Sequence, residues 1–156
     1  MSDNTSTSAV PDISTFLGAV PHIRALGLRL EQAGPGGVIL RLPYQDKLIG
    51  DPDSGVLAGG AITSLLDTTA GAAVFVALPE FRPIATLDLR IDYLKPAIPG
   101  EDVLANVQCC RVTRWIAFAR GLAYHRIPDD PIANCAATFM ATGSQPLRPP
   151  APDKMP

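Results

Sequence analysis

The sequence has no excess of basic residues and few cysteines. Its 13 Lys and Arg residues are outnumbered by 15 Asp and Glu residues, so the net charge is −2, and the basic residues are scattered along the chain. Because nucleic acids are bound through clustered positive charge, we expect no nucleic-acid partner. The three cysteines show neither C-x-x-C nor Cys/His spacing, which argues against a metal site and predicts reduced thiols.

Motifs typical of several enzyme classes are also missing. The sequence contains no G-x-S-x-G, no G-x-G-x-x-G and no phosphate loop with G-K-[ST]. A Ser/His triad, a dinucleotide-binding turn and a nucleotide-phosphate loop therefore have no support. The N-terminal stretch MSDNTSTSAV lacks the basic and apolar regions of a signal peptide, so we expect a cytoplasmic protein.

What remains is the composition of one globular domain with polar or proline-rich ends. Of 156 residues, 47% are hydrophobic and 18% are charged, which supplies enough apolar material for a sizeable core. Residues 1–11 are rich in Ser and Thr, and residues 144–156 are rich in Pro, so both segments are predicted to be disordered tails. A single domain is expected over residues 12–143.

The pattern between the tails predicts an α+β fold with one long helix. Asp12 is placed to cap a short helix, which Pro21 ends or restarts. Alternating residues around the turn GPGG predict a hairpin, and Pro79 ends an apolar helix that begins near Ala58. Short turns such as Pro99-Gly100 should then join neighbouring strands into an antiparallel meander. The predicted strands span residues 83–95, 102–114, 115–127 and 132–142.

The first of these strands, 83–95, alternates in polarity. One face is expected to hold Thr86, Asp88, Arg90 and Asp92, and the other Leu87, Leu89, Ile91 and Tyr93. A single subunit would leave this strand at a sheet edge, and long unpaired edges are usually covered or paired. Its charge order D-x-R-x-D is self-complementary in an antiparallel pair, so we expect a homodimer joined through this strand.

One carboxylate, Asp67, interrupts the apolar segment LAGGAITSLLDTTAGAAV at residues 57–74. Polar residues crowd the centre of this segment and no aromatic or basic residues anchor its ends, so a buried helix is expected and not a membrane span. Helical spacing puts Gly60, Thr63, Ser64, Asp67, Ala70, Gly71 and Val74 on one face, and Ile62, Leu65, Leu66, Ala73 and Val76 on another. The second face is the expected core anchor, and the first is a groove of small residues with a carboxylate in its floor.

This arrangement can serve chemistry or structure. Gly59 and Gly60 lie where the helix begins, so their N–H groups lack intrahelical partners and a substrate carbonyl can approach them. Such a donor, with Asp67 two turns further on, suits hydrolysis of an activated acyl group, and we expect Gly60 and Ser64 to line the substrate groove. Alternatively, Asp67 accepts structural hydrogen bonds from Thr63 or from a neighbouring strand, and the Gly pair is only a cap.

Two segments of the sequence carry a family resemblance. They are LAGGAITSLLDTTAGAAV and ATLDLRIDYLKPAIPGEDVLANVQCCRVTRWIAFARGLAYHR. With them, the chain from about residue 26 to residue 143 resembles the PaaI-like hotdog-fold acyl-CoA thioesterases of the phenylacetate-degradation type. The shared features are a Gly-Gly pair, an acid seven residues after its second Gly, and T-x-D-L-x-x-x-Y-L-x-P after the helix.

The resemblance implies a fold and a set of roles. The fold is the hotdog, in which a curved antiparallel sheet wraps one long helix. The N–H of Gly59 would hold the thioester carbonyl, and Asp67 would act as general base or as nucleophile. Thr86 would help to orient water, in a site shared across a dimer, and relatives suggest a dimer of dimers.

The sequence departs from the family at one position, where Ala58 replaces the usual His before the Gly pair. Gln45 is the one amide side chain in the preceding loop that could match a further family position. A non-catalytic hotdog protein that binds acyl-CoA or a partner is therefore an alternative to the enzyme. Hydration of an acyl thioester usually needs a His, and neither His22 nor His125 is suitably placed.

The expected substrate is a short-chain or aromatic acyl-CoA, with no metal and no cofactor beyond the CoA of the substrate. CoA phosphates require local positive charge despite the acidic balance of the chain. Arg114 is our first choice because it lies beside a predicted turn between two strands. The other candidates are Arg90, Lys95, Arg111 and Arg120.

Overall fold

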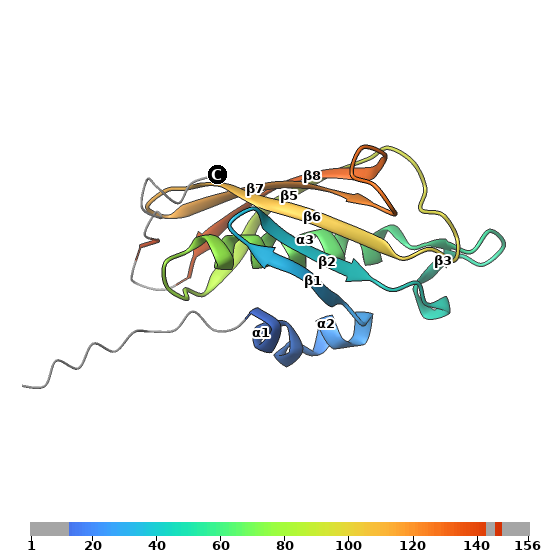
Figure 1. Ribbon diagram of the computed structural model, residues 1–156, viewed down its shortest axis with the longest axis horizontal. Helices are drawn as coiled ribbons and strands as arrows, with labels where there is room; N and C mark the ends of the chain where they lie inside the picture. Colours follow the sequence, from blue (N-terminus) through green and yellow to red (C-terminus); the bar gives the residue numbers. More distant parts are fainter. Residues whose placement is uncertain (1–12, 143–145, 148–156) are drawn as a thin grey trace, which may run out of the picture.

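A computed structural model describes residues 13–142 and 146–147 of the chain (Figure 1). The predicted N-terminal tail, the Asp12 cap and most of the predicted C-terminal tail lie outside these residues. Within the latter segment, Leu147 is 2% exposed, and its N–H donates to the carbonyl of Arg114 at 2.7 Å.

Two short helices open the described part of the chain: α1 (Ile13–Ala19) and α2 (Pro21–Leu26). Pro21 occupies the first turn of α2, where its missing N–H costs nothing, so the predicted restart of the helix is confirmed. Gly27 ends α2 in the left-handed region, at φ 70°, where glycine is favoured. The buried side chains of both helices are Leu17, Ile23 and Leu26.

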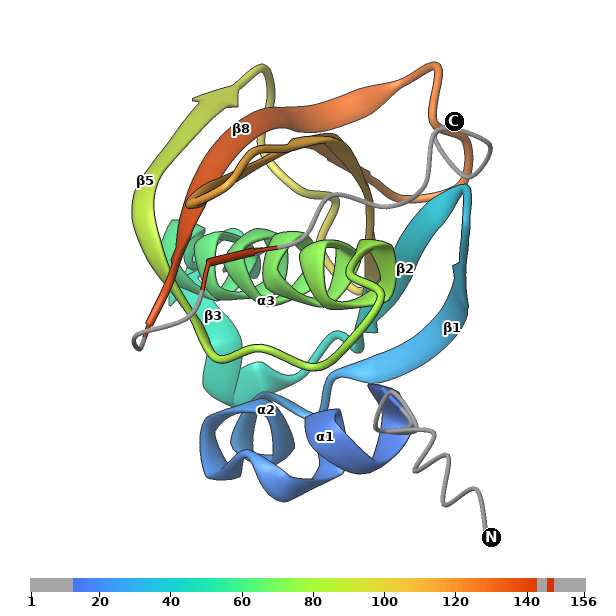
Figure 2. The ribbon, with the colours of Figure 1, turned by 90° about the vertical axis from the view of Figure 1, so that its left-hand side faces the viewer.

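The long helix α3 (Gly59–Ala77) lies inside the curve of the sheet (Figure 2). The helix is long enough to span a membrane, and an 18-residue stretch of it has a mean hydropathy of 1.4. However, 56% of that stretch is buried inside the fold, as expected of a core helix. Leu65 and Leu66 are fully buried, which confirms them as core anchors. Ala70 and Val74 were expected in the groove, but they are fully buried as well, so this part of the predicted groove face belongs to the core.

One antiparallel sheet of six strands wraps α3. In the order of the sheet the strands are β1 (Arg29–Gly34), β2 (Gly37–Leu42), β6 (Val103–Val112), β7 (Ile116–Tyr124), β8 (Pro131–Ala141) and β5 (Ile84–Tyr93). Before α3, the loop holds the 3-10 turn η1 (Asp46–Leu48) and a small ribbon of β3 (Ile49–Asp51) with β4 (Val56–Leu57). The predicted α+β fold, with a curved antiparallel sheet around one long helix, is confirmed.

The strand order of the sheet differs from the prediction at one strand, β5. Pro99-Gly100 was expected to join β5 to an adjacent β6, but β5 pairs with β8, and β6 lies between β2 and β7. The segment between β5 and β6 carries the chain across the end of the sheet, so it cannot form a hairpin. Only β6, β7 and β8 form the predicted meander, and β5 is left at one edge of the sheet, as expected.

Candidate active site

The start of α3 presents two backbone N–H groups. Helix α3 begins at Gly59, and the residue before it, Ala58, makes no side-chain cap. Both Gly59 and Gly60 are exposed, and among residues 13–142 no acceptor lies against either N–H. The positive end of the helix dipole adds to the attraction of these donors for an oxygen that develops negative charge.

Two turns further along α3, the carboxylate of Asp67 is partly exposed and, within residues 13–142, is held by one hydrogen bond. The hydroxyl Oγ1 of Thr86 on β5 donates to Oδ1 of Asp67 at 2.9 Å. A carboxylate with one such contact keeps lone pairs for a further donor, such as a water molecule. The structure therefore brings together Asp67 and Thr86, two of the predicted catalytic residues.

The contact between Thr86 and the helix shows that the predicted faces of β5 are wrong in part. Thr86 was expected on the face of Asp88, opposite Tyr93, yet both Thr86 and Tyr93 reach α3. The cause is a register shift between Thr86 and Asp88, where β5 has an extra residue opposite β8. Such a bulge re-aims the side chains next to it, and here it turns Thr86 toward the carboxylate.

Sequence reasoning gave no role to Tyr93, which contacts both Gly59 and Thr63. Thr63 was considered as a groove residue or a donor to Asp67, and its hydroxyl instead lies against the phenol of Tyr93. The phenol of Tyr93 donates to the carbonyl of Gly59 at 2.7 Å and lies 3.1 Å from Oγ1 of Thr63. The signal was present, since Tyr93 is the Tyr of T-x-D-L-x-x-x-Y-L-x-P, but strand alternation alone does not reveal its contact with the helix. We call Gly59, Thr63, Asp67, Thr86 and Tyr93 the α3–β5 cluster.

Ser64, predicted to line the substrate groove, lies beside a histidine from another helix. Nε2 of His22, an exposed residue in the first turn of α2, is 3.3 Å from Oγ of Ser64. Both predicted groove residues reach the surface, because Gly60 is exposed and Ser64 is partly exposed.

Two other candidates lie away from this cluster. The amide of Gln45 donates to the carbonyl of Leu26 at 2.7 Å, and so ties the loop to the end of α2. Arg114 lies at the end of the sheet opposite Tyr93: Tyr93 pairs with Ala133 near the start of β8, whereas the turn holding Arg114 adjoins the end of β8. The guanidinium of Arg114 is 5.5 Å from the ring centroid of Trp115.

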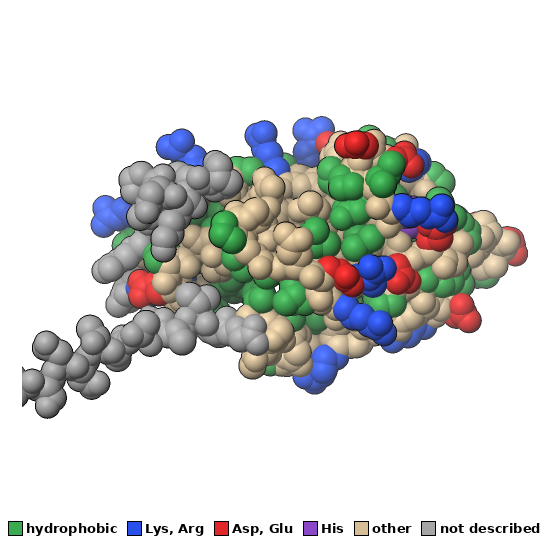
Figure 3. Space-filling view, in the orientation of Figure 1, with side chains coloured by type: hydrophobic (Ala, Val, Ile, Leu, Met, Phe, Trp, Pro, Cys, Tyr) green, Lys and Arg blue, Asp and Glu red, His purple; other side chains and the backbone are tan. Residues whose placement is uncertain are grey.

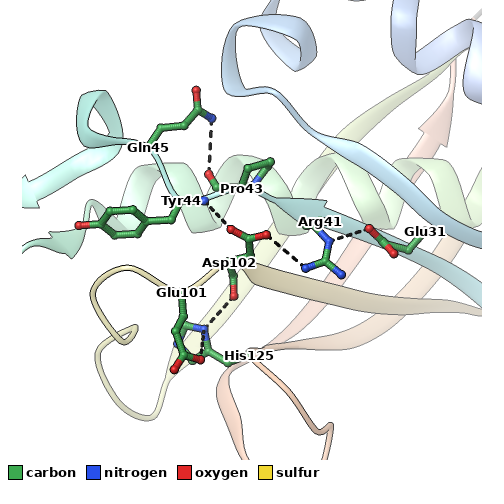
Figure 4. A network of polar contacts seen from close by, with 8 residues as sticks. All are labelled: Glu31, Arg41, Pro43, Tyr44, Gln45, Glu101, Asp102 and His125. Atoms are coloured by element: carbon green, nitrogen blue, oxygen red, sulfur yellow. Dashed lines mark hydrogen bonds and ion pairs between the residues drawn. The ribbon is translucent and has the colours of Figure 1, made fainter.

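A second group of polar side chains lies at the loop end of β2 and β6 (Figure 4). We call Glu31, Arg41, Tyr44, Glu101, Asp102 and His125 the loop network. Arg41 donates to Glu31 at 2.6 Å and to Asp102 at 3.2 Å, and Asp102 also accepts the backbone N–H of Tyr44 at 2.9 Å. The Arg41 hydrogen bond lowers the pKa of the Glu31 carboxyl. Figure 3 likewise shows acidic and basic side chains next to one another on this face of the molecule.

His125 in the loop network has a fixed tautomer. Its Nε2 accepts the N–H of Ile98 at 2.8 Å, and its Nδ1 is 2.8 Å from the carbonyl of Asp102. Since an N–H must face an acceptor, the hydrogen is on Nδ1. With both ring nitrogens occupied by backbone groups, His125 holds a loop in place and has no nitrogen left for general acid or base chemistry.

Two of the three cysteines, Cys109 and Cys135, are poor nucleophiles. Burial raises the pKa of the Cys109 thiol to about 11 and that of the Cys135 thiol to about 11, so both are protonated at neutral pH. No group of three or more His, Cys, Asp or Glu side chains that could hold a metal ion occurs in the described part of the chain. The groups that the start of α3 and its neighbour β5 bring together are a carboxylate, a hydroxyl and backbone N–H donors.

Comparison with known sequences places these features in a family. The family model described as the thioesterase superfamily matches residues 54–128, which include α3 and β5. A medium/long-chain acyl-CoA thioesterase of Escherichia coli, YigI, is 31% identical over 138 residues, covering 80% of this chain and 88% of that protein. A Halobacterium salinarum protein named as an esterase is 38% identical over 97 residues, which cover 60% of this chain and 63% of that protein.

Solved structures give the same result for the fold. A Pseudomonas aeruginosa protein is 48% identical, with a TM-score of 0.76, and the match covers 83% of this chain and 96% of that one. The phenylacetic acid degradation protein PaaI from Thermus thermophilus is 23% identical, with a TM-score of 0.68 and coverage of 79% and 100%. At that identity PaaI supports the fold alone, which is the PaaI-like hotdog fold expected from the sequence.

Proposed function

Because this chain belongs to the thioesterase superfamily and is a thioester hydrolase, we propose that it hydrolyses acyl-CoA to a free acid and CoA. The observation that carries the proposal is the carboxylate of Asp67, held by Thr86 on a helix whose exposed N-terminus presents the N–H of Gly59. The name of the E. coli relative, an acyl-CoA thioesterase, supports CoA as the thiol.

In the proposed reaction, Gly59 donates its N–H to the thioester oxygen while Asp67 acts on the carbonyl carbon. As a general base, Asp67 takes a proton from water, the water oxygen bonds to carbon, and the C–S bond then breaks. As a nucleophile, Asp67 itself bonds to carbon and water later releases the acid. In both routes CoA leaves as a thiolate that takes up a proton, and no metal or further cofactor is used.

The proposed site is shared between two copies of the chain. Asp67 lies eight positions after Gly59, so their backbones are about 12 Å apart along the helix, a gap that a short Asp side chain closes only in part. An oxyanion donor lies about 3 Å from its oxygen and a directly attacking group about 3 Å from the carbon. Asp67 of one subunit and Gly59 of its partner therefore serve one substrate more easily than the pair within one chain.

Strand β5 is the proposed dimer contact, because its outer edge has no strand partner among the described residues. Leu87 and Tyr93 on this strand are 52% and 48% exposed, and the following Leu94 is 54% exposed, so pairing with a second copy would bury apolar surface. Arg90 donates to Asp92 of its own chain at 3.0 Å, and it can be shared with an Asp of the partner. Two such dimers would form the proposed tetramer.

Arg114 is proposed to contact the CoA phosphates. It is exposed and lies far from Gly59 of its own chain, so the contact, like the site, would depend on the assembled dimer. Replacing Arg114 by Ala should raise KM for acyl-CoA and leave kcat little changed. An unchanged KM would remove Arg114 from the site.

Two classes of acyl group are candidates for the substrate. The resemblance of the sequence to phenylacetate-degradation thioesterases favours a short-chain or aromatic acyl group. The name of the E. coli relative, which matches at higher identity than PaaI, favours a medium or long chain. We propose a cytoplasmic location, where acyl-CoA substrates are available.

The test is a thiol-release assay on purified protein against acetyl-, phenylacetyl-, octanoyl- and palmitoyl-CoA, with the Asp67→Asn variant as control. Release by the wild type and its loss in the variant would support the proposal, and the panel separates the two acyl candidates. Acyl-CoA binding measured by calorimetry, with no release of thiol across the panel, would instead identify a non-catalytic acyl-CoA-binding protein.

A further inference from the structure

Tyr93 makes a contact with α3 that its place in a strand does not require. Its phenol donates to the carbonyl of Gly59 at 2.7 Å, and a side chain added at Gly59 would meet the same phenol at 3.5 Å. Tyr93 is 48% exposed in the single chain, so burial within its own subunit does not account for its position. The hydroxyl is the part of the side chain that joins β5 to the first residue of the helix.

The direction of each hydrogen bond is fixed by counting hydrogens. A phenol carries one hydrogen, and that of Tyr93 faces a carbonyl, which can only accept. In the 3.1 Å contact with Tyr93, the donor is therefore the hydroxyl of Thr63. The result is a chain in which Thr63 donates to Tyr93 and Tyr93 donates to Gly59, and each bond in such a chain strengthens the next.

The carbonyl that Tyr93 holds is half of a planar peptide unit. The C=O of Gly59 and the N–H of Gly60 belong to one trans peptide, so fixing the first aims the second in the opposite direction. The preceding unit is fixed in the same way, because the carbonyl of Ala58 accepts the N–H of Ala61 at 3.0 Å. The directions of the two exposed donors, the N–H groups of Gly59 and Gly60, are thus fixed because the carbonyl of each peptide unit is held by a hydrogen bond.

The hydrogen bond from Tyr93 restrains a part of the backbone that the local sequence leaves flexible. Two successive glycines have more backbone freedom than any other pair, and Ala58 offers no side chain to cap the helix. We propose that Tyr93, supported by Thr63, is a positioning residue that holds the Gly59–Gly60 peptide so that the Gly60 N–H faces the thioester oxygen beside the N–H of Gly59. The inference rests on the proposed function, and it assigns Tyr93 no contact with the reacting atoms.

The test compares two Tyr→Phe variants that each lose one hydrogen bond to a carbonyl. Tyr93→Phe removes the bond to Gly59, and the control Tyr44→Phe removes the 2.7 Å bond from Tyr44 to the carbonyl of Gly55, outside the α3–β5 cluster. We expect Tyr93→Phe to lower kcat about tenfold with KM changed less than about twofold, as for one lost hydrogen bond that acts in the transition state. Tyr44→Phe should keep the wild-type kcat. Equal kcat values in the two variants would overturn the proposal.

Thr63→Val, which keeps the shape of the side chain, sharpens the result. It should lower kcat by less than Tyr93→Phe does, and the double variant should be no worse than Tyr93→Phe alone, because Thr63 acts through the phenol. Additive losses would show that Thr63 acts independently and would overturn the proposed chain.

An NMR measurement separates failure of this inference from failure of the proposed function. In the ¹H–¹⁵N spectrum of the free protein, Tyr93→Phe should shift the Gly60 amide resonance and speed its hydrogen exchange, whereas Tyr44→Phe should do neither. A wild type that releases no thiol would refute the proposed function, and the shifted Gly60 resonance would still support the fixed peptide. An unchanged Gly60 amide in Tyr93→Phe would refute the positioning role whether or not the protein is active.

Discussion

The α3–β5 cluster and the loop network are both groups of polar side chains at the rim of the same sheet, but they use their hydrogen-bonding groups differently. In the loop network the charges are paired: Arg41 lies between Glu31 and Asp102, and both nitrogens of His125 contact the backbone. In the α3–β5 cluster the charged group is Asp67, and its one partner among the described residues is the neutral Thr86.

This difference separates a structural role from a chemical one. A carboxylate that is already matched by Arg and backbone N–H groups stabilises loops, but it has little capacity left for a substrate or a water molecule. A carboxylate with one hydroxyl partner, on a helix with unpaired N–H donors, keeps that capacity. We therefore propose different roles for the same residue type, Asp, in the two regions, because its surroundings differ.

Matched substitutions of the two aspartates give the largest expected effect. Asp67→Asn keeps the shape and the contact with Thr86 but removes the base or nucleophile, so kcat for acyl-CoA hydrolysis should fall about 10²–10⁴-fold. Asp102→Asn, the same change in the loop network, should leave kcat near that of the wild type. Comparable losses in both variants would erase the functional distinction between the regions.

The next effect tests the N–H of Gly59. Gly59→Pro removes this donor at the first position of the helix, where Pro is favoured, and the backbone of Ala58, at φ −60° and ψ 133°, suits a residue that precedes Pro. We expect kcat to fall about 10²–10³-fold, as for one lost oxyanion donor.

Gly59→Ala is the control for that variant, because it keeps the N–H and its added carbon has room beside Tyr93. Steady-state kinetics and thermal melts of both variants separate loss of the donor from loss of the fold. Equal activity of the Pro and Ala variants would exclude the N–H of Gly59 from the reaction.

Removal of the hydroxyl of Thr86 should have a smaller effect. Thr86→Val deletes the hydrogen bond to Asp67, and the loss of one hydrogen bond to a charged group should lower kcat about tenfold. Thr86→Ser keeps the hydroxyl and should retain most of the activity. A Val variant as active as the Ser variant would mean that the Thr86 hydroxyl does not orient the carboxylate.

In the loop network the expected effect is on stability. Asp102 accepts two hydrogen bonds, from Arg41 and from the N–H of Tyr44, and its side chain is partly exposed. Asp102→Ala should therefore lower the free energy of unfolding by about 1–2 kcal/mol, measured by urea denaturation. A variant as stable as the wild type would show that the network contributes little to the fold.

The smallest effect concerns pH. Arg41 lowers the pKa of Glu31, so the charged form of Glu31 stabilises the fold above the ordinary Glu pKa, and this contribution is lost as the pH falls through the lowered value. Glu31→Gln should cost less than about 1 kcal/mol at pH 7, because the pair is partly exposed, and nothing at strongly acidic pH. A cost that grows toward acidic pH would have the wrong sign for this pair.

The sequence predicted the elements better than the contacts between them. Hydrophobic periodicity and Pro79 located α3, and alternation located the strands, because both signals are local. The neighbour of β5 was wrong because a turn such as Pro99-Gly100 does not reveal whether the chain crosses the sheet. Similarly, Thr86 was placed on the wrong face because a bulge has no clear sequence signal in this strand.

The candidate site was predicted in part. Asp67 was recognisable because an acid is rare in an apolar helix, and the Gly pair because it lies where that helix begins. The contact of Tyr93 with Gly59 and that of His22 with Ser64 join elements distant in the sequence, so spacing could not reveal them. The sequence did not reveal which way the Gln45 side chain points. In the structure it points to the end of α2.

The central claim is that Gly59 of one subunit and Asp67 of its partner act on one thioester. Its most direct test is a purified heterodimer, with different affinity tags, of one Gly59→Pro subunit and one Asp67→Asn subunit. If the site is shared, one of the two sites contains neither substitution, and the heterodimer should recover about half of the wild-type kcat although each homodimer is nearly inactive. Activity no higher than that of the two homodimers would contradict the shared site, because then every site would carry a defect.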